Sequence, residues 1–67
     1  MAFKMRIYEV WVRARAEGGH QFDLGNVVVD ARSKAEAGRL GMDKLWDSRL
    51  DSASCTPVVE VRRIPRT

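Results

Sequence analysis

The sequence predicts an α+β domain in which one helix packs on one face of a three-stranded antiparallel sheet. Two β-branched and aromatic segments, 3–16 and 20–32, are separated by a Gly-Gly pair; a helix-capping pattern follows, and a third β-branched segment covers 58–64. The order of elements is therefore β-β-α-β. A right-handed crossover through the helix places the third strand beside the first, which gives the strand order 2-1-3.

The first two segments form an antiparallel hairpin in this prediction. Gly18 and Gly19 supply the positive φ angles of a two-residue hairpin loop at little steric cost. Side chains alternate between the two faces of each strand, and one face of the pair is the core face. On that face the register pairs Tyr8 with Val29, Val10 with Val27 and Val12 with Gly25.

The other face of the hairpin combines apolar side chains with arginines. Because a single helix covers only the core face, this outer face is exposed, and an exposed apolar patch on so small a chain is typical of an interface. We therefore expect a homodimer or a protein partner there, with the aromatic side chains as anchors. A register slip or a bulge at Gly25-Asn26 would instead turn some of these residues inward. The residues expected to bind the partner are Ile7, Trp11, Arg13, Arg15, Phe22, Leu24 and Val28.

The helix is predicted to begin after Ser33. The residues Ser33-Lys34-Ala35-Glu36 match a capping box, in which the serine oxygen accepts a backbone hydrogen bond and the glutamate reaches back. Gly38 and Gly41 inside this helix cost about 1 kcal/mol each relative to alanine, so they either permit close packing or break the helix. Helical periodicity places Ala35, Gly38, Met42, Leu45 and Trp46 against the sheet, with Glu36, Leu40, Asp43 and Asp47 opposite.

The rest of the chain is expected to form a loop and a final strand. Ser, Asp and Thr residues in 48–57 are typical of a helix end and a connecting loop. The strand at 58–64 follows a proline, where a missing N–H costs least, and Val59 and Val61 are its expected core residues. Residues 65–67 are expected to be a loose tail, and the 67 residues form one domain.

Gly38-Arg39-Leu40-Gly41 is a GxxG element with one basic residue between the second and third predicted strands. This element resembles the GxxG loop of KH domains. In that family the loop joins two helices and clamps the backbone of single-stranded nucleic acid. The resemblance implies contact roles for Gly38, Arg39, Leu40 and Gly41; packing of the two glycines on the sheet is the alternative.

Nucleic acid is the alternative partner for the outer face of the hairpin. Arg13 and Arg15 flank Trp11 and Phe22, and bases can stack on aromatic rings while arginines contact phosphates. A net charge of +3 at pH 7 permits a polyanionic partner without requiring one. The residues available to such a partner are Arg13, Arg15, Gly38, Arg39, Leu40, Gly41, Arg62, Arg63 and Arg66.

Several functional classes have little support in this sequence. No apolar segment approaches the roughly 20 residues that span a bilayer, so no membrane partner is expected. One histidine, His20, and one cysteine, Cys55, do not complete a zinc site, and no third group is evident that would orient them as a catalytic dyad. The GxGxxG and P-loop patterns are also absent. We therefore expect no enzymatic activity, no cofactor, no metal and no small-molecule substrate.

Composition indicates a cytoplasmic protein that acts by binding. Apolar residues make up 45% and charged residues 31% of the chain, which is a globular balance. The single cysteine and the lack of a secretory pattern at the start favour a reducing compartment. Nine arginines against three lysines are typical of a high-GC bacterium or its phage. We therefore expect a small accessory or inhibitor protein of a phage or mobile element.

Overall fold

Residues 5–52 and 54–65 are described by the computed structural model of the chain. Phe3, at the predicted start of the first strand, and Arg66 and Thr67 of the predicted tail lie outside these ranges. The described residues form three strands and two helices, in the order β1 (Arg6–Arg15), β2 (Gln21–Ala31), α1 (Lys34–Leu45), α2 (Arg49–Ser52) and β3 (Thr56–Arg63).

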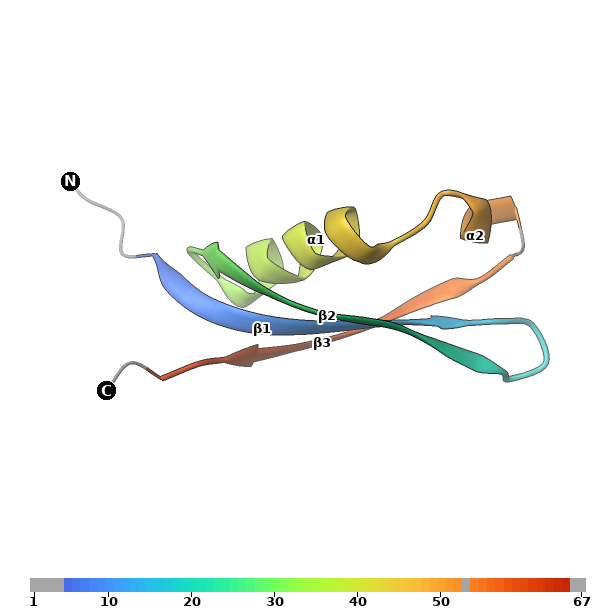
Figure 1. Ribbon diagram of the computed structural model, residues 1–67, viewed down its shortest axis with the longest axis horizontal. Coiled ribbons are helices and arrows are strands. Elements are labelled where there is room, and N and C mark those ends of the chain that lie inside the picture. The colour runs from blue at the N-terminus through green and yellow to red at the C-terminus, as the bar shows by residue number, and fades with distance from the viewer. Residues whose placement is uncertain (1–4, 53, 66–67) are drawn as a thin grey trace.

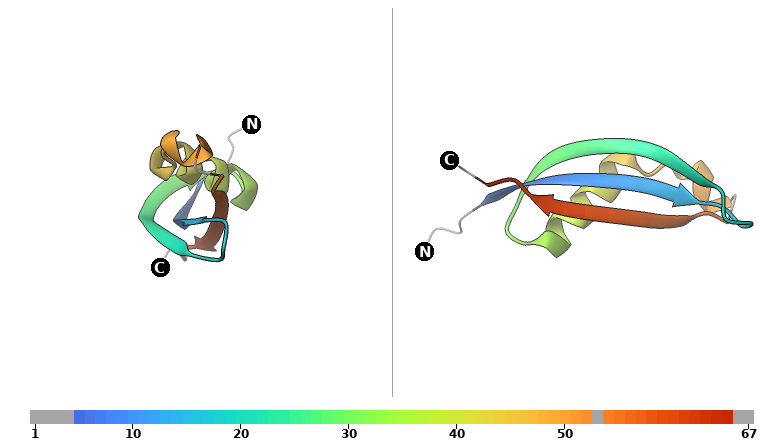
Figure 2. Two further views of the ribbon diagram at one scale, coloured as in Figure 1. Left: turned by 90° about the vertical axis from the view of Figure 1, so that its right-hand side faces the viewer. Right: turned by 90° about the horizontal axis from the view of Figure 1, so that it is seen from below.

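The three strands form one antiparallel sheet in the order β2-β1-β3, and α1 packs on one face of it (Figure 1). The predicted α+β class and the 2-1-3 strand order are therefore confirmed. Both helices lie on the same side of the sheet, and the strands are long and twisted (Figure 2). The Cα atoms extend over 45 × 22 × 13 Å, so the molecule is an elongated, thin slab.

The core is a single layer of small side chains between the sheet and α1. Its largest fully buried side chains are two valines of the central strand, Val10 and Val12. Burial alternates along β1, as the predicted core face requires. The buried residues are Tyr8, Val10, Val12, Ala14, Val29, Ala31 and Ala37, and Val59 and Val61 of β3 pack against this cluster as predicted.

The capping box at the start of α1 is confirmed. Ser33 Oγ accepts a hydrogen bond from the backbone N–H of Glu36 at 3.2 Å, and Glu36 Oε1 accepts one from the backbone N–H of Arg32 at 3.4 Å. The glutamate thus reaches back one residue further than expected. At the other end, the backbone N–H of Trp46 donates to the carbonyl oxygen of Met42 at 2.8 Å.

The face that α1 turns to the sheet is the predicted one in part. As predicted, Met42, Leu45 and Trp46 pack against the core, and Gly38 faces Val59 and Val61 of β3. The helix continues unbroken through both of its glycines. Its buried residues are Ala37 and Gly41, whereas Ala35 is exposed and Leu40 packs against the core. A β-carbon added at Gly41 would lie 2.8 Å from Val10 Cβ, which real contacts do not tolerate. Close approach to β1 therefore selects the small residues, and a periodicity based on large apolar residues misses that choice.

The hairpin register is confirmed in one half and wrong in the other. The predicted pairs hold up to Val12 opposite Gly25, but Arg13 then pairs with Asp23 and Ala14 with Phe22. Leu24 is the extra residue of a β-bulge at this point. The bulge divides the hairpin into a part near the turn and a part near the other end of the sheet.

Local chemistry explains the bulge. Asp23 Oδ1 accepts a hydrogen bond from the backbone N–H of Gly25 at 2.9 Å, which forms an Asx turn across Leu24. Gly25 has a φ of 108°, a backbone angle that residues with a β-carbon rarely adopt. At the turn, the Ala16 N–H donates to the His20 carbonyl at 2.7 Å, so the loop has three residues instead of the predicted two. The longer loop and the bulge offset each other, and the predicted register survives beyond the bulge.

The predicted loop at 48–57 contains the short helix α2. Asp47 accepts hydrogen bonds from the Arg49 backbone N–H at 2.9 Å and from Arg49 Nη2 at 2.8 Å. The backbone N–H of Leu50 also donates to the carbonyl of Asp47 at 2.9 Å. These bonds supply acceptors for N–H groups that a helix start leaves without intrahelical partners.

A pair of glycine substitutions tests the contact between α1 and β1. Gly41→Ala should lower the free energy of unfolding by about 1–3 kcal/mol relative to Gly38→Ala, because its methyl group collides with Val10. Gly38→Ala is the matched control: it gains the same helix propensity, and its methyl group would lie at an ordinary 3.5 Å from Val61 Cγ2. Urea denaturation at one protein concentration measures both. Equal stabilities would contradict the close approach.

The carboxyl group of Asp47 should titrate below its ordinary pKa of 3.8, because Arg49 donates side-chain and backbone hydrogen bonds to it. A lowered pKa in the folded state means that this contribution to stability is present at neutral pH and is lost as the pH falls through the lowered value. A ¹³C NMR titration measures the midpoint. Arg49→Gln should return it toward 3.8; a wild-type midpoint at or above that value would contradict the assignment.

Candidate functional site

The candidate site is the face of the sheet opposite α1, which we call the helix-free face. Both described helices lie on the other side (Figure 2). Alternation and register define its members on all three strands, and the backbone N–H of Ile64 donates to the carbonyl of Ile7 at 2.9 Å just beyond β3. The apolar side chains of this face are Ile7, Trp11, Val28, Val58 and Ile64.

Trp11 occupies the middle of the helix-free face on the central strand. Its partners in the register are Asn26 on β2 and Glu60 on β3. Asn26 Nδ2 donates a hydrogen bond to Glu9 Oε2 at 2.7 Å, and Arg13 Nη1 donates to Glu60 Oε1 at 3.1 Å. Polar side chains on either side of Trp11 are thus held by cross-strand bonds, while the tryptophan is partly buried.

The structure places five of the seven predicted partner-binding residues on the helix-free face. Phe22 and Leu24 are the exceptions, because the bulge removes them from it. Leu24 packs against the core, and Phe22 lies opposite the buried Ala14 on the helix side with 51% of its surface exposed. The five residues on the face are Ile7, Trp11, Arg13, Arg15 and Val28.

Sequence reasoning missed the contribution of β3 to this face. Val58 lies opposite Arg13, and Ile64 follows the strand next to Ile7. The signal was present, since core positions at Val59 and Val61 require the neighbouring residues to point the other way. The predicted outer face was made of hairpin residues alone.

The KH-like interpretation of the GxxG element is wrong. In KH domains the loop joins two helices, whereas Gly38 and Gly41 lie within one continuous helix and face the sheet. Leu40 is partly buried against the core, and Arg39 is exposed. These four residues do not form a loop that could clamp a nucleic-acid backbone.

The arginines expected to contact nucleic acid do not share one surface. Arg62 is opposite Glu9 on the helix-free face, whereas Arg63 is opposite Tyr8 on the helix side, and Arg66 lies outside the described residues. Arg13 is already paired with a carboxylate. Among the described residues of the helix-free face, the arginines Arg13, Arg15 and Arg62 are outnumbered by the carboxylates Glu9, Asp23, Asp30 and Glu60.

His20 and Cys55 both lie at the end of the sheet that carries the hairpin turn, but β1 separates the segments to which they belong. Within residues 5–52 and 54–65, His, Cys, Asp and Glu side chains do not gather in threes that could hold a metal ion. In the same part of the chain, neither helix has the length and apolar character that crossing a membrane requires.

Comparison with known proteins assigns the chain to no family. No protein-family model, no curated protein and no solved structure matches it. What the chain binds is therefore inferred from its own surface.

The bulge that shapes this face can be tested at Gly25. Gly25→Ala should lower the free energy of unfolding by about 1–2 kcal/mol, because a residue with a β-carbon is strained at a φ of 108°. The nearest atom to the new methyl group would be Leu45 Cδ2 at 3.9 Å, so crowding adds nothing. Gly25→Asn is the control, since asparagine tolerates positive φ better. Thermal denaturation compares the three chains, and an alanine variant as stable as wild type would refute the bulge geometry.

Proposed function

We propose that this chain is a non-enzymatic interaction protein that forms a homodimer through the helix-free face. The observation that supports this most is Trp11 in the middle of that face, with apolar side chains from all three strands around it. Val28 exposes 56% of its surface there. Aromatic residues with arginine nearby are frequent hot spots of interfaces, and a sheet face of this composition is more favourable when covered.

The weak core of the single chain supports the same proposal. Its largest fully buried side chains are two valines, Val10 and Val12. A domain of about 60 residues buries only about 60% of its unfolded surface, so small domains gain much from association. Packing two helix-free faces together would give a second apolar layer and place the sheets in the interior.

The helix-free face is long and narrow. It runs along the 45 Å length of the molecule and is as wide as the three strands, the direction in which the Cα atoms span 13 Å (Figures 1 and 2). A stable interface buries about 800 Å² on each partner, so a dimer would have to cover most of this face. A face with one central aromatic residue also suits a two-fold axis, because the same patch then meets itself.

The mixed charges of the face favour a second copy as the occupant. Arg15 is near the hairpin turn, and Asp30 is near the opposite end of the sheet, which we call the open end. A two-fold axis perpendicular to the strands would set the hairpin end of one copy over the open end of the other. Arg15 of each copy would then approach Asp30 of the second copy, and opposite charges would meet at both rims.

Nucleic acid is less well supported as the occupant of this face. A polyanion would meet more carboxylates than arginines among its described residues.

The amino-acid composition of the chain would suit a cytoplasmic accessory or inhibitor protein of a phage or mobile element. In such a protein, dimerisation would build the functional unit.

Two exposed apolar residues of β2 on opposite faces give a matched test. Val28→Lys should raise the dimer dissociation constant by about 100-fold or more, because an unpaired ammonium group buried in an interface costs several kcal/mol. Phe22→Lys should leave dimerisation unchanged, since Phe22 is on the helix side. Light scattering coupled to size-exclusion chromatography, over a range of concentrations and at low and high salt, gives the molar mass.

Two outcomes would reject this proposal. A wild-type chain that stays monomeric over the whole concentration range would exclude the homodimer. Equal weakening by Val28→Lys and Phe22→Lys would exclude the helix-free face as the interface.

Trp11→Ala should weaken the dimer without unfolding the domain, because truncating a central aromatic anchor typically costs about 2 kcal/mol or more of binding energy.

A further inference from the structure

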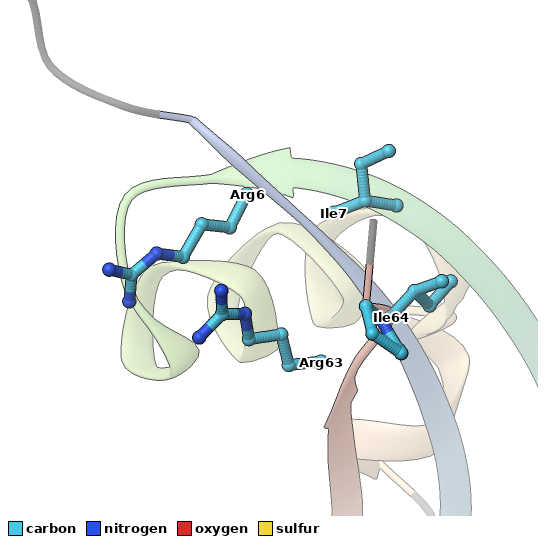
Figure 3. A pocket seen from close by; sticks show the side chains of 5 residues that line it. Arg6, Ile7, Arg63 and Ile64 are labelled. Carbon is cyan, nitrogen blue, oxygen red and sulfur yellow. The ribbon is translucent and has the colours of Figure 1, made fainter. Parts of the chain in front are cut away.

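A small pocket at the open end of the sheet brings two arginines together. Its volume is about 170 Å³, and it is formed where β1 begins and β3 ends. The hydrogen bond between the Ile64 N–H and the Ile7 carbonyl, 2.9 Å long, joins the two backbones at this point. The residues that line the pocket are Arg6, Ile7, Arg63, Ile64 and Pro65 (Figure 3).

The pocket has one basic and one apolar side. Arg6 lies opposite the buried Ala31, and Arg63 lies opposite the buried Tyr8, so both arginines belong to the helix side of the sheet. Their side chains extend in the same direction, away from those of Ile7 and Ile64 (Figure 3). Two adjacent strands therefore present two guanidinium groups next to an apolar wall.

Among the residues that the structure describes, the lining of this pocket includes no carboxylate. Within residues 5–52 and 54–65, Arg6 and Arg63 form no hydrogen bond or ion pair through their side chains. Both guanidinium groups are positively charged and extend in the same direction, so they repel each other (Figure 3). An anion placed between the two guanidinium groups would remove this repulsion.

We propose that the Arg6–Arg63 pocket binds a phosphate group. The planar guanidinium offers paired N–H donors that match phosphate oxygens, and two of them can hold several oxygens of one tetrahedral anion. A dianionic phosphate balances both positive charges, whereas a carboxylate balances one. Pro65, which also lines the pocket, supplies apolar surface for the organic part of a phosphate ester.

This site goes beyond the proposed dimer and does not depend on it. Arg6 and Arg63 are exposed on the helix side, so covering the helix-free face leaves both guanidinium groups accessible. The phosphate can come from a free phosphate ester or from the backbone of a nucleic acid. The chemistry at the arginines is the same in both cases, and the experiment below separates the two sources.

The test measures binding of inorganic phosphate by isothermal titration calorimetry at low ionic strength, at a pH where phosphate is mainly dianionic. Arg6→Gln and Arg63→Gln should each weaken binding by at least about tenfold, because each removes charge-assisted hydrogen bonds. Arg39→Gln is the matched control: it removes the same charge from an exposed position of α1 outside the pocket and should change binding less than about twofold. Circular dichroism confirms that each variant is folded.

A second arm uses a short single-stranded oligonucleotide in place of inorganic phosphate. Binding that is lost in both pocket variants and falls steeply with salt supports the site and identifies a nucleic-acid backbone as the source. Oligonucleotide binding that is absent or indifferent to the pocket variants, together with pocket-dependent phosphate binding, supports the site with a free phosphate ester. The proposal is overturned if neither ligand binds in a way that depends on Arg6 and Arg63, or if Arg39→Gln weakens binding equally.

Discussion

At Gly41, helix α1 lies so close to β1 that a methyl group on the glycine would collide with Val10. The short distance between α1 and β1 explains why the core consists of valines, alanines and one tyrosine, since larger side chains would hold the helix further from the sheet. It also explains why α1 covers the sheet with its small residues. A thin layer of this kind buries little apolar surface. Covering the other face of the sheet would bury more.

The β-bulge at Leu24 determines which residues share that other face. Without it, Phe22 would lie opposite Arg15 on the same face as Trp11; with it, Phe22 lies opposite Ala14 on the helix side. The Asx turn from Asp23 to Gly25 satisfies the N–H that the bulge leaves out of the ladder. This one polar contact thus determines on which face of the sheet Phe22 lies, and it places Asp23 opposite Arg13 on the helix-free face.

The elements with strong local signals could be predicted from the sequence. Alternation along β1, the capping box at Ser33 and the β-branched residues of β3 specified three strands, one long helix and the sheet order. The apolar residues of the contact face of α1 could be found by periodicity, but the buried positions of Ala37 and Gly41 could not, because they depend on which residues are small enough to lie close to β1. The KH-like interpretation was wrong because Gly38 and Gly41 face the sheet from within one continuous helix.

For the candidate site, the place of Trp11 on the outer face followed from strand alternation alone. Its neighbourhood did not. The bulge depends on a side-chain hydrogen bond that competes with the ladder, and the three-residue loop concealed the bulge by restoring the register beyond it. The arginine pocket needs the end of β1 and the end of β3 in one place, which requires the tertiary pairing of segments distant in the chain.

The strand order has a consequence for how the fold is made. Strand β1 is central, yet it is synthesised first and receives its second neighbour last: Arg15 pairs with Gln21 across the turn but with Thr56 only after both helices. Long-range pairing of this kind slows folding. Until β3 emerges from the ribosome, the nascent hairpin carries an open hydrogen-bonding edge along β1 and an apolar face at Trp11, the two features that promote association of unfinished chains. The interval before β3 arrives is therefore the stage at which this chain is most vulnerable to misassembly.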